Sequence, residues 1–452
     1  MKGFSIILAV VYALLHLFDY NGIKQDWFIP ITIVLYVILN VLYLYKYRRH
    51  QLFCFELFFA ISFFLCSLLT PFIFPLLDSF VGRVFISTPY NIIKVYSLSF
   101  LGYCCYMTGL IGDKESNSAS LEYKITFNRN CVNYSNLLCF LFIVIFYFSG
   151  GSRLITLYSD LADNLNNRYE GWGAYMAYAM YAYTLSTVIN FMYLKGKAIG
   201  LKSLFRKLPK LYLINSFLLV YPMVISGLRS GAVQLVIPLL MMFGIAIKKI
   251  RLRSVLLILL AGYIALIYIG LTRSGSGVTE RESPVLTLLF DFVSANGANS
   301  FFVNYVDNNG ITNGTNMVLQ VASIIPFMQS ILLNFISRDS LAPNSSSFFT
   351  DTFMDSTQGG MGTGMIGDIY YSFGFIGIIV LMYFMGLLTR KLSKNNNSPY
   401  NLAMLIALSG NAVFAARVEY CFILRNIAYT VIFLFIILHL PQSSYNDNSL
   451  CD

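Results

Sequence analysis

The run Phe28–Tyr45, FIPITIVLYVILNVLYLY, contains no charged residue, and Lys46, Arg48 and Arg49 follow it directly. A helix that crosses the hydrocarbon core of a bilayer needs about 20 predominantly apolar residues. Lysine and arginine concentrate at the cytoplasmic ends of such helices. This run therefore predicts a transmembrane helix whose carboxyl end faces the cytoplasm.

Similar apolar runs fill most of the chain. The twelve runs cover residues 3–19, 28–45, 52–70, 92–111, 137–150, 173–194, 211–226, 232–247, 254–271, 366–388, 400–416 and 420–440. Of the 452 residues, 57% are hydrophobic and 12% are charged. About 25% of the residues of a soluble protein are charged, because its surface faces water. The composition excludes a soluble protein and predicts an all-α integral membrane protein with about 12 transmembrane helices.

Basic residues alternate along the chain from one connection between apolar runs to the next. One set of connections, counted with Lys2, contains 20 of the 31 basic residues, and the opposite set contains 15 of the 21 acidic residues. Because basic residues concentrate in cytoplasmic connections, the pattern places both termini in the cytoplasm. The net charge of +10 then reflects topology in a lipid bilayer, and we predict no nucleic-acid partner.

The external connection 272–365 is much longer than the others and is rich in Asn, Ser, Thr and Gly. Long ordered loops usually carry function. Within it, an apolar stretch is interrupted by Pro326 and Gln329, which favours short helices that lie on the membrane face or dip into it. The sequence thus predicts helices 1–9 in residues 1–271, a loop of short helices in 272–365, helices 10–12 in 366–440 and a cytoplasmic tail in 441–452.

Arginine residues occur at the predicted outer ends of several helices. Arg229 lies in a turn between two glycines, Arg273 begins the long loop, and Arg417 and Arg425 are close to the start of the last helix. An arginine at membrane depth is costly and normally faces a partner or a watery cavity. Each arginine alone could instead extend towards lipid phosphates. As a set they predict a site for a lipid diphosphate, which guanidinium groups bind through paired hydrogen bonds.

Five acidic residues are predicted near the same surface, namely Asp291, Asp351, Asp355, Asp368 and Glu419. Glycosyl transfer with inversion needs a base that takes a proton from the acceptor hydroxyl. Glu419 is adjacent in sequence to the last arginine pair, and Asp291 lies in a largely apolar stretch, so these two rank first. Any one of the five could instead pair with an arginine or cap a helix.

Two aromatic residues, Tyr169 and Trp172, belong to or adjoin the external connection 149–171 and could stack on sugar rings. Aromatic residues at a membrane interface more often form belts that anchor helices. The three histidines lie outside the predicted external cluster, and the long loop contains no Asp-x-Asp pattern. We therefore predict a site that uses no metal ion and no other cofactor.

Several short motifs follow one another through the second half of the chain. They are Gly227-Leu-Arg-Ser-Gly231, Thr272-Arg-Ser-Gly275, Pro343-Asn-Ser-Ser346, Gly362-Thr-Gly-Met-Ile-Gly-Asp368, Tyr371-Ser-Phe-Gly-Phe-Ile-Gly377 and Ala415-Ala-Arg417 followed by Arg425. Their order around one long loop resembles the Wzy family of oligosaccharide repeat-unit polymerases, which assemble O-antigen and other bacterial surface polysaccharides.

This resemblance implies a GT-C-like helical fold in the bacterial inner membrane, with the site on the periplasmic side. It implies an inverting, metal-independent glycosyltransferase that moves a growing glycan from undecaprenyl diphosphate onto the next lipid-linked repeat unit. It also implies a partner of the Wzz class, which regulates chain length.

The resemblance further implies roles for individual residues. Arg229 and Arg273 would hold the donor diphosphate and stabilise it as it leaves, with Arg417 and Arg425 helping to hold a lipid diphosphate. Glu419 or Asp291 would be the base. Asn344, in the Pro-Asn-Ser-Ser motif, is a candidate for substrate binding, and Tyr169 and Trp172 stay candidates on the grounds given above.

Two alternative functions stay open from the sequence. An O-antigen ligase shares the long loop and the arginines, but ligases carry a functional histidine in that loop, and this chain has none between His50 and His439. A flippase or other transporter of lipid-linked sugars would show related halves and charges deep within its helices. Here Glu56 and, nearer the helix ends, Asp19 and Arg425 approach that depth, so the sequence favours the polymerase.

Overall fold

The structure is a computed structural model in which every regular element of the described residues is a helix. It describes residues 1–18, 20, 22–47, 54–70, 89–112, 125–151, 172–197, 200–225, 229–248, 284–325, 328–335, 344–353, 362–394 and 398–440, with parts of 254–265. No strand occurs in these residues. The predicted all-α class is confirmed.

The helices fall into three groups along the chain. The first contains α1 (Lys2–Leu17), α2 (Gln25–Tyr47), α3 (Phe55–Phe63), the π-helix η1 (Phe64–Leu68) and α6 (Pro89–Leu110). The second contains α7 (Arg129–Phe148), α9 (Trp172–Tyr193), α10 (Leu201–Lys207), α11 (Lys210–Ile225) and α12 (Arg229–Ala246). The third contains α14 (Pro284–Asn309), α15 (Thr315–Ala322), α16 (Met328–Phe335), α17 (Ser345–Phe353), α18 (Met365–Lys394), α19 (Pro399–Gly410), the 3₁₀-helix η5 (Ala415–Arg417) and α20 (Phe422–His439).

Every predicted apolar run contains described helical residues. Among the described residues, the four helices α2, α7, α18 and α20 are long and apolar enough to cross a membrane. Shorter apolar helices are α1, α3 together with η1, α11 and α12. The chain is therefore a membrane protein of apolar helices. The number of twelve crossings and the division of the chain at residues 271, 365 and 440 stay predictions.

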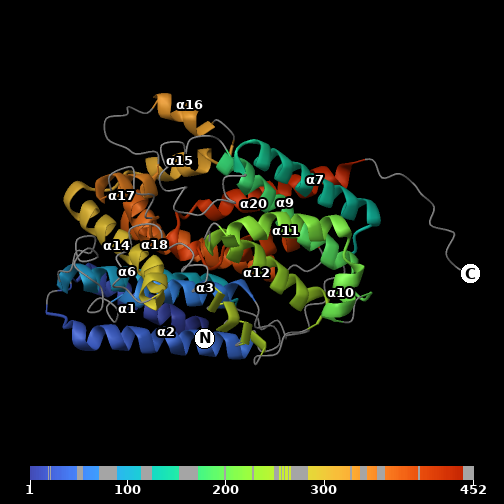
Figure 1. The fold of residues 1–452 in the computed structure, drawn as a ribbon. Coiled ribbons are helices and arrows are strands. Elements are labelled where there is room, and N and C mark those ends of the chain that lie inside the picture. Colours follow the sequence, from blue (N-terminus) through green and yellow to red (C-terminus); the bar gives the residue numbers. More distant parts are fainter. Residues whose placement is uncertain are drawn as a thin grey trace, which may run out of the picture.

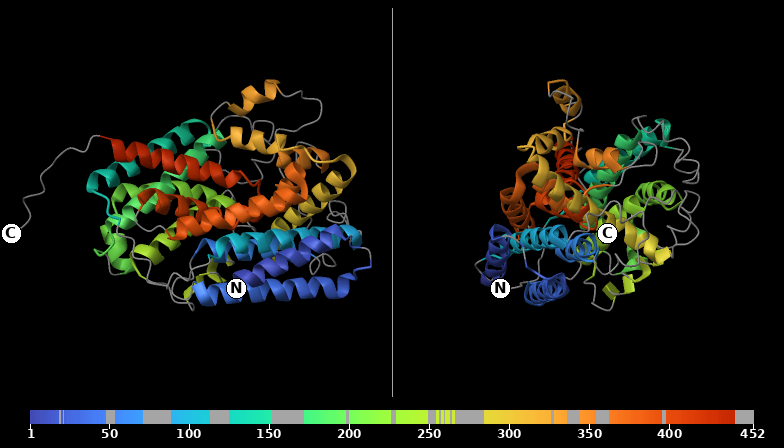
Figure 2. Two further views of the ribbon diagram at one scale, coloured as in Figure 1. Left: turned by 180° about the vertical axis from the view of Figure 1, so that it is seen from behind. Right: turned by 90° about the vertical axis from the view of Figure 1, so that its left-hand side faces the viewer.

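The long helices run side by side in one bundle (Figure 1). Helices α1 and α2 form one side of it, and α15 and α16 lie on the opposite side (Figures 1 and 2). The basic helix α10, which contains Lys202, Arg206 and Lys207, lies at one end of the bundle, whereas α14 and α17 lie at the other end (Figure 1). Helix α10 and the pair α14 and α17 are thus separated along the bundle, whereas the topology that the charge pattern indicates stays a prediction.

Two glycines allow α6 and α18 to pack closely. A Cβ atom on Gly109 of α6 would overlap the backbone oxygen of Tyr383, and one on Gly386 of α18 would overlap that of Tyr106. Without a hydrophobic force between helices in lipid, association depends on van der Waals contact, and small residues let the backbones approach. This contact fixes the position of α18, which carries part of the candidate site.

Gly374 interrupts α18 with a φ of +64° and a ψ of −153°, a conformation that glycine adopts with little cost. The backbone oxygens of Tyr371 and Ser372, just before this break, accept hydrogen bonds from other parts of the chain. Their donors are the N–H groups of Thr312 (3.0 Å) and Gly314 (2.9 Å). The break therefore attaches the connection between α14 and α15 to the first part of α18.

Helix α14 has 26 residues, whereas the sequence predicted only short helices in the loop 272–365. Its residues Phe302 and Val303 are buried, and the helix packs against α6, α18 and η1. Asn296 and Gly297 are poor helix formers, so the sequence pattern did not predict a long helix here. Tertiary packing of the apolar face outweighs this weak propensity.

Candidate functional site

Asp368 lies in the first turn of α18 and is fully buried, with 0% of its surface exposed. Its Oδ1 accepts hydrogen bonds from Ser345 Oγ (2.6 Å) and from two side-chain amides of α15. These are Gln320 Nε2 (2.7 Å) and Asn316 Nδ2 (2.8 Å). Its Oδ2 accepts a hydrogen bond from the backbone N–H of Tyr420 (2.9 Å). One carboxyl group thus joins α18, α15, the start of α17 and the segment before α20.

The glycine-rich motif before Asp368 determines how closely α18 approaches α14. A Cβ atom on Gly364 would overlap the side-chain oxygen of Asn299 in α14. The backbone N–H of Gly367 donates a hydrogen bond of 2.7 Å to the same oxygen. The first N–H groups of an α-helix have no partner within the helix. Asn299 therefore supplies an acceptor to the start of α18 from a different helix.

Glu419 lies next to this network. Its Oε1 accepts a hydrogen bond of 3.3 Å from the backbone N–H of Ser346. The neighbours Ser345 and Tyr420 both donate to Asp368, so Asp368 holds both chain segments that meet at Glu419. Burial, and after it the negative charge of Asp368, raises the pKa of Glu419 from 4.5 to about 7.

Arg417 and Arg425 flank Glu419 in the chain. Arg417 ends η5, and its guanidinium carbon lies 6.0 Å from the centroid of the Phe414 ring. Arg425 is in the first turn of α20, 5.0 Å from the centroid of the Phe422 ring, and its charge acts to lower the pKa of Glu419. Among the described residues, the buried Nε atom of Arg425 has no hydrogen-bond partner. This N–H is a donor only, so any partner it has must be an acceptor.

Five of the predicted site residues are described in part or not at all. Arg229 begins α12, Trp172 begins α9 and Asp291 lies in α14, and for these three the backbone is described but the side chain is not. Arg273 and Tyr169 lie outside the described residues. The proposed roles of all five stay predictions.

The described acidic residues do not all lie at one site. Asp351 is exposed on α17, and Asp355 lies outside the described residues. Asp291 lies eight positions before Asn299, the residue of α14 that contacts the start of α18. Eight residues span about 12 Å along a helix. Among the described carboxyl groups, Asp368 and Glu419 are the predicted pair that the fold brings together.

Asn344 caps α17, because its Oδ1 accepts a hydrogen bond of 2.7 Å from the backbone N–H of Ser347. Its role in substrate binding stays a prediction. Three residues that hold the buried carboxyl group, Asn316, Gln320 and Ser345, were not among the predicted site residues. The first two are four positions apart and so share one face of α15, in a segment without charged residues. That spacing was the available signal.

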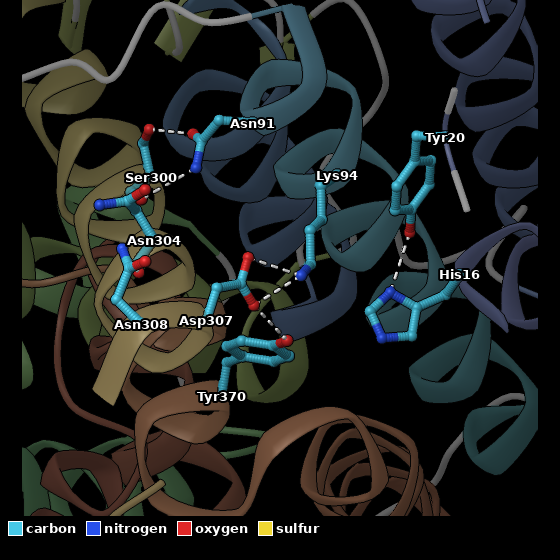
Figure 3. Close-up of polar contacts among 9 residues, drawn as sticks. All are labelled: His16, Tyr20, Asn91, Lys94, Ser300, Asn304, Asp307, Asn308 and Tyr370. Carbon is cyan, nitrogen blue, oxygen red and sulfur yellow. Dashed lines mark hydrogen bonds and ion pairs between the residues drawn. The ribbon is translucent and has the colours of Figure 1, made fainter. Parts of the chain in front are cut away.

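A second polar cluster joins α6, α14 and α18 (Figure 3). Lys94 Nζ contacts both carboxylate oxygens of Asp307, at 2.6 and 2.7 Å, and Tyr370 Oη lies 3.4 Å from Asp307 Oδ1. Asn91 Nδ2 donates to the backbone oxygen of Ser300 at 3.4 Å. The sequence pattern does not reveal this ion pair, because its lysine falls inside a predicted transmembrane run and its aspartate in the long loop.

The two parts of the candidate site have complementary chemistry. A carboxyl group with a pKa near 7 can take up a proton from a substrate hydroxyl near neutral pH. The guanidinium group of Arg425, whose charge acts on Glu419, can bind an anionic leaving group and stabilise its charge. Within the described residues, no group of three or more His, Cys, Asp or Glu residues is arranged to hold a metal ion. Independence from metal stays a prediction.

Comparison with known proteins identifies a family. The family model described as O-antigen polysaccharide polymerase Wzy matches residues 3–448. No curated protein and no solved structure matches the chain, so the GT-C-like fold stays a prediction. The family match covers nearly the whole chain and agrees with the sequence motifs and the apolar helices. The chain belongs to the O-antigen polysaccharide polymerase Wzy family.

Proposed function

We propose that this chain transfers a growing glycan from undecaprenyl diphosphate onto the non-reducing end of an incoming lipid-linked repeat unit. The reaction takes place at the periplasmic face of the bacterial inner membrane, with both termini of the chain in the cytoplasm. The family acts in the polymerisation of O-antigen repeat units. The observation that carries the proposal is Glu419, which has a pKa of about 7 and lies between two arginines in the chain.

Glu419 is the proposed general base. It takes the proton from the acceptor hydroxyl, whose oxygen forms a bond to the anomeric carbon of the donor. The bond from that carbon to the diphosphate oxygen breaks, and its electron pair leaves with undecaprenyl diphosphate, so the anomeric configuration inverts. Asp291 is the second candidate for the base. Glu419 ranks first because it adjoins the network of Asp368.

Arginines bind the diphosphate groups in this proposal. Arg417 and Arg425 flank the base and hold one lipid diphosphate, for which the buried Nε–H of Arg425 is a donor without a described protein partner. Arg229 and Arg273 hold the donor diphosphate and stabilise the charge that develops on it. Such stabilisation is usually the largest single catalytic contribution. With these four arginines assigned to the diphosphate groups, the proposed reaction uses no metal ion.

Asp368 is a positioning residue in this mechanism. It accepts hydrogen bonds from Ser345 and from the backbone of Tyr420. These two residues are the sequence neighbours of Ser346 and Glu419, which are hydrogen-bonded to each other. Its two partners on α15 extend the same network towards the external segment.

We also propose a regulator of the Wzz class as a partner, because the family resemblance implies one.

The function is tested by deleting the gene and displaying surface lipopolysaccharide on a gel. We expect the ladder of long chains to collapse to a lipid core that carries one repeat unit, and the wild-type gene to restore it. Loss of the single-unit band as well would instead indicate a ligase or a flippase. A ladder that survives the deletion would exclude polymerisation by this chain.

The base is tested by complementing the deletion with Glu419→Gln. General base catalysis contributes about 10²- to 10⁴-fold to rate, so this variant should leave only the single-unit band. Asp351→Asn is the matched control, because it makes the same chemical change at an exposed carboxyl group of α17. Full ladder formation by the Glu419 variant would eliminate it as the base.

A further inference from the structure

The carboxyl-terminal part of α14 presents a line of uncharged and charged polar side chains. Ser300, Asn304 and Asn308 succeed one another at intervals of four residues, and Asp307 lies beside them (Figure 3). Asn308 is exposed, Asn304 is half-buried, and the side chain of Asp307 is 31% exposed. Asparagine is a poor helix former, so this composition has a cost in helix stability. Amide and carboxylate groups together offer both donors and acceptors for neighbouring hydroxyl groups.

The charges within this cluster cancel. Lys94 has only 8% of its side chain exposed, and its ammonium group contacts both oxygens of Asp307. The ion pair leaves no net positive charge to attract a diphosphate, in contrast to the arginines that flank Glu419. A neutral ligand with many hydroxyl groups fits these side chains better than an anion does.

An exposed aromatic ring adjoins the polar line. Tyr90, near the start of α6, is 43% exposed. Its ring centroid lies 5.8 Å from Lys94 Nζ and 5.9 Å from the centroid of Tyr20. Tyr20 is buried and is held in turn by a hydrogen bond of 3.0 Å to Nδ1 of His16 (Figure 3). A supported aromatic ring beside polar groups can pack against the C–H face of a sugar ring.

The position of the cluster relates it to the proposed catalytic carboxyl pair. Tyr370, which contacts Asp307, follows Asp368 by two positions in α18, and residues two apart face different sides of a helix. The cluster therefore lies across α18 from the buried carboxyl group, and a helix with its side chains is about 10 Å wide. An oligosaccharide can extend over that distance, whereas a single sugar cannot.

We propose that Tyr90, Asn304, Asp307 and Asn308 form a binding surface for the sugar residues of the repeat unit, away from its diphosphate. The ion pair to Lys94 holds Asp307 in place on this surface. An ion pair that only anchored α14 to α6 would not need the exposed amides and the exposed ring beside it. The identity of the ligand rests on the proposed polymerase function, whereas its neutral, hydroxyl-rich chemistry rests on the side chains.

The test uses the full chain in lipid nanodiscs and measures its affinity for the repeat-unit oligosaccharide released from its lipid by mild acid. Asn308→Ala should weaken binding roughly fivefold, the effect of losing one hydrogen bond. Asn309→Ala is the matched control and should leave affinity unchanged. Asn309 is also exposed and donates its side-chain amide to the backbone one turn earlier, as Asn308 does, but it faces a different side of α14. Tyr90→Ala should weaken binding as well, and inorganic diphosphate should not compete.

Three results would overturn the proposed surface or its neutral character. Equal affinity of the wild type, Asn308→Ala and Asn309→Ala, or the absence of binding to the wild type, would overturn the sugar-binding surface. Competition by inorganic diphosphate would overturn its neutral character. These results are distinct from failure of the proposed function, which would appear as a wild-type gene that cannot restore the ladder. A chain that restores the ladder but binds equally in all variants refutes only the surface.

Discussion

The backbone N–H of Ser346 donates a hydrogen bond of 3.3 Å to Oε1 of Glu419, which joins the start of α17 to the segment before α20. This contact and the charge of Arg425 act to lower the pKa of Glu419. Burial and the charge of Asp368 outweigh them and raise that pKa to about 7. The protonation of Glu419 therefore responds to each of these neighbours, which makes their effects measurable.

The pH dependence of polymerisation should report the ionisation of Glu419. A general base acts in its ionised form, so kcat/KM should rise as pH increases through about 7 and then level off. The measurement is initial rate against pH with purified enzyme and lipid-linked repeat units. A rate that falls as pH rises through this range would show that the protonated form of Glu419 is the active one, as in a general acid. A flat profile would show that the ionisation of Glu419 does not affect the reaction.

Asp368→Asn should shift this profile towards lower pH. Removing the negative charge of Asp368 removes one of the causes that raise the pKa of Glu419, so the rise in rate should begin earlier. The asparagine amide cannot accept the hydrogen bonds that both carboxylate oxygens accept. Leaving a buried donor without a partner costs about 1–3 kcal/mol, so the melting temperature should fall as well. A lower melting temperature with an unshifted profile would limit Asp368 to a structural role.

Replacing Arg425 should move the profile in the opposite direction. The charge of Arg425 acts to lower the pKa of Glu419, so in Arg425→Met the rise in rate should occur at higher pH. Loss of the guanidinium group should also raise KM for the lipid-linked donor. Arg425→Lys retains the charge but not the paired hydrogen bonds. We expect it to restore the pH profile without restoring KM, and restoration of both would contradict diphosphate binding through paired hydrogen bonds.

Gly364→Ala should separate α18 from α14. The added Cβ atom would overlap the side-chain oxygen of Asn299, and overpacking of this kind costs about 1–3 kcal/mol. Thermal unfolding in detergent should show the lower stability. Gly3→Ala is the control, because a Cβ atom on Gly3 in α1 would have no neighbour within 4 Å. Equal melting temperatures for the two variants would show that the helices tolerate a wider separation.

The sequence alone determined that the chain is a membrane protein of apolar helices, and its motifs indicated the family. Both are local properties. A run such as Phe28–Tyr45 favours a helix in lipid whatever surrounds it, because its own backbone groups satisfy each other within the helix. The same locality made Glu419 and its flanking arginines recognisable, since they lie within nine consecutive residues.

Only the tertiary structure decided which distant groups meet. Asp368 bonds to partners 23 to 52 positions away, and Lys94 pairs with Asp307 across 213 positions. These contacts depend on how closely two helices approach, as at Gly109 and Gly386, and therefore on two surfaces at once. Hydropathy and charge are properties of one segment, so they revealed the helices and the arginines. The buried carboxyl pair, the length of α14 and the polar cluster on it required the packed bundle.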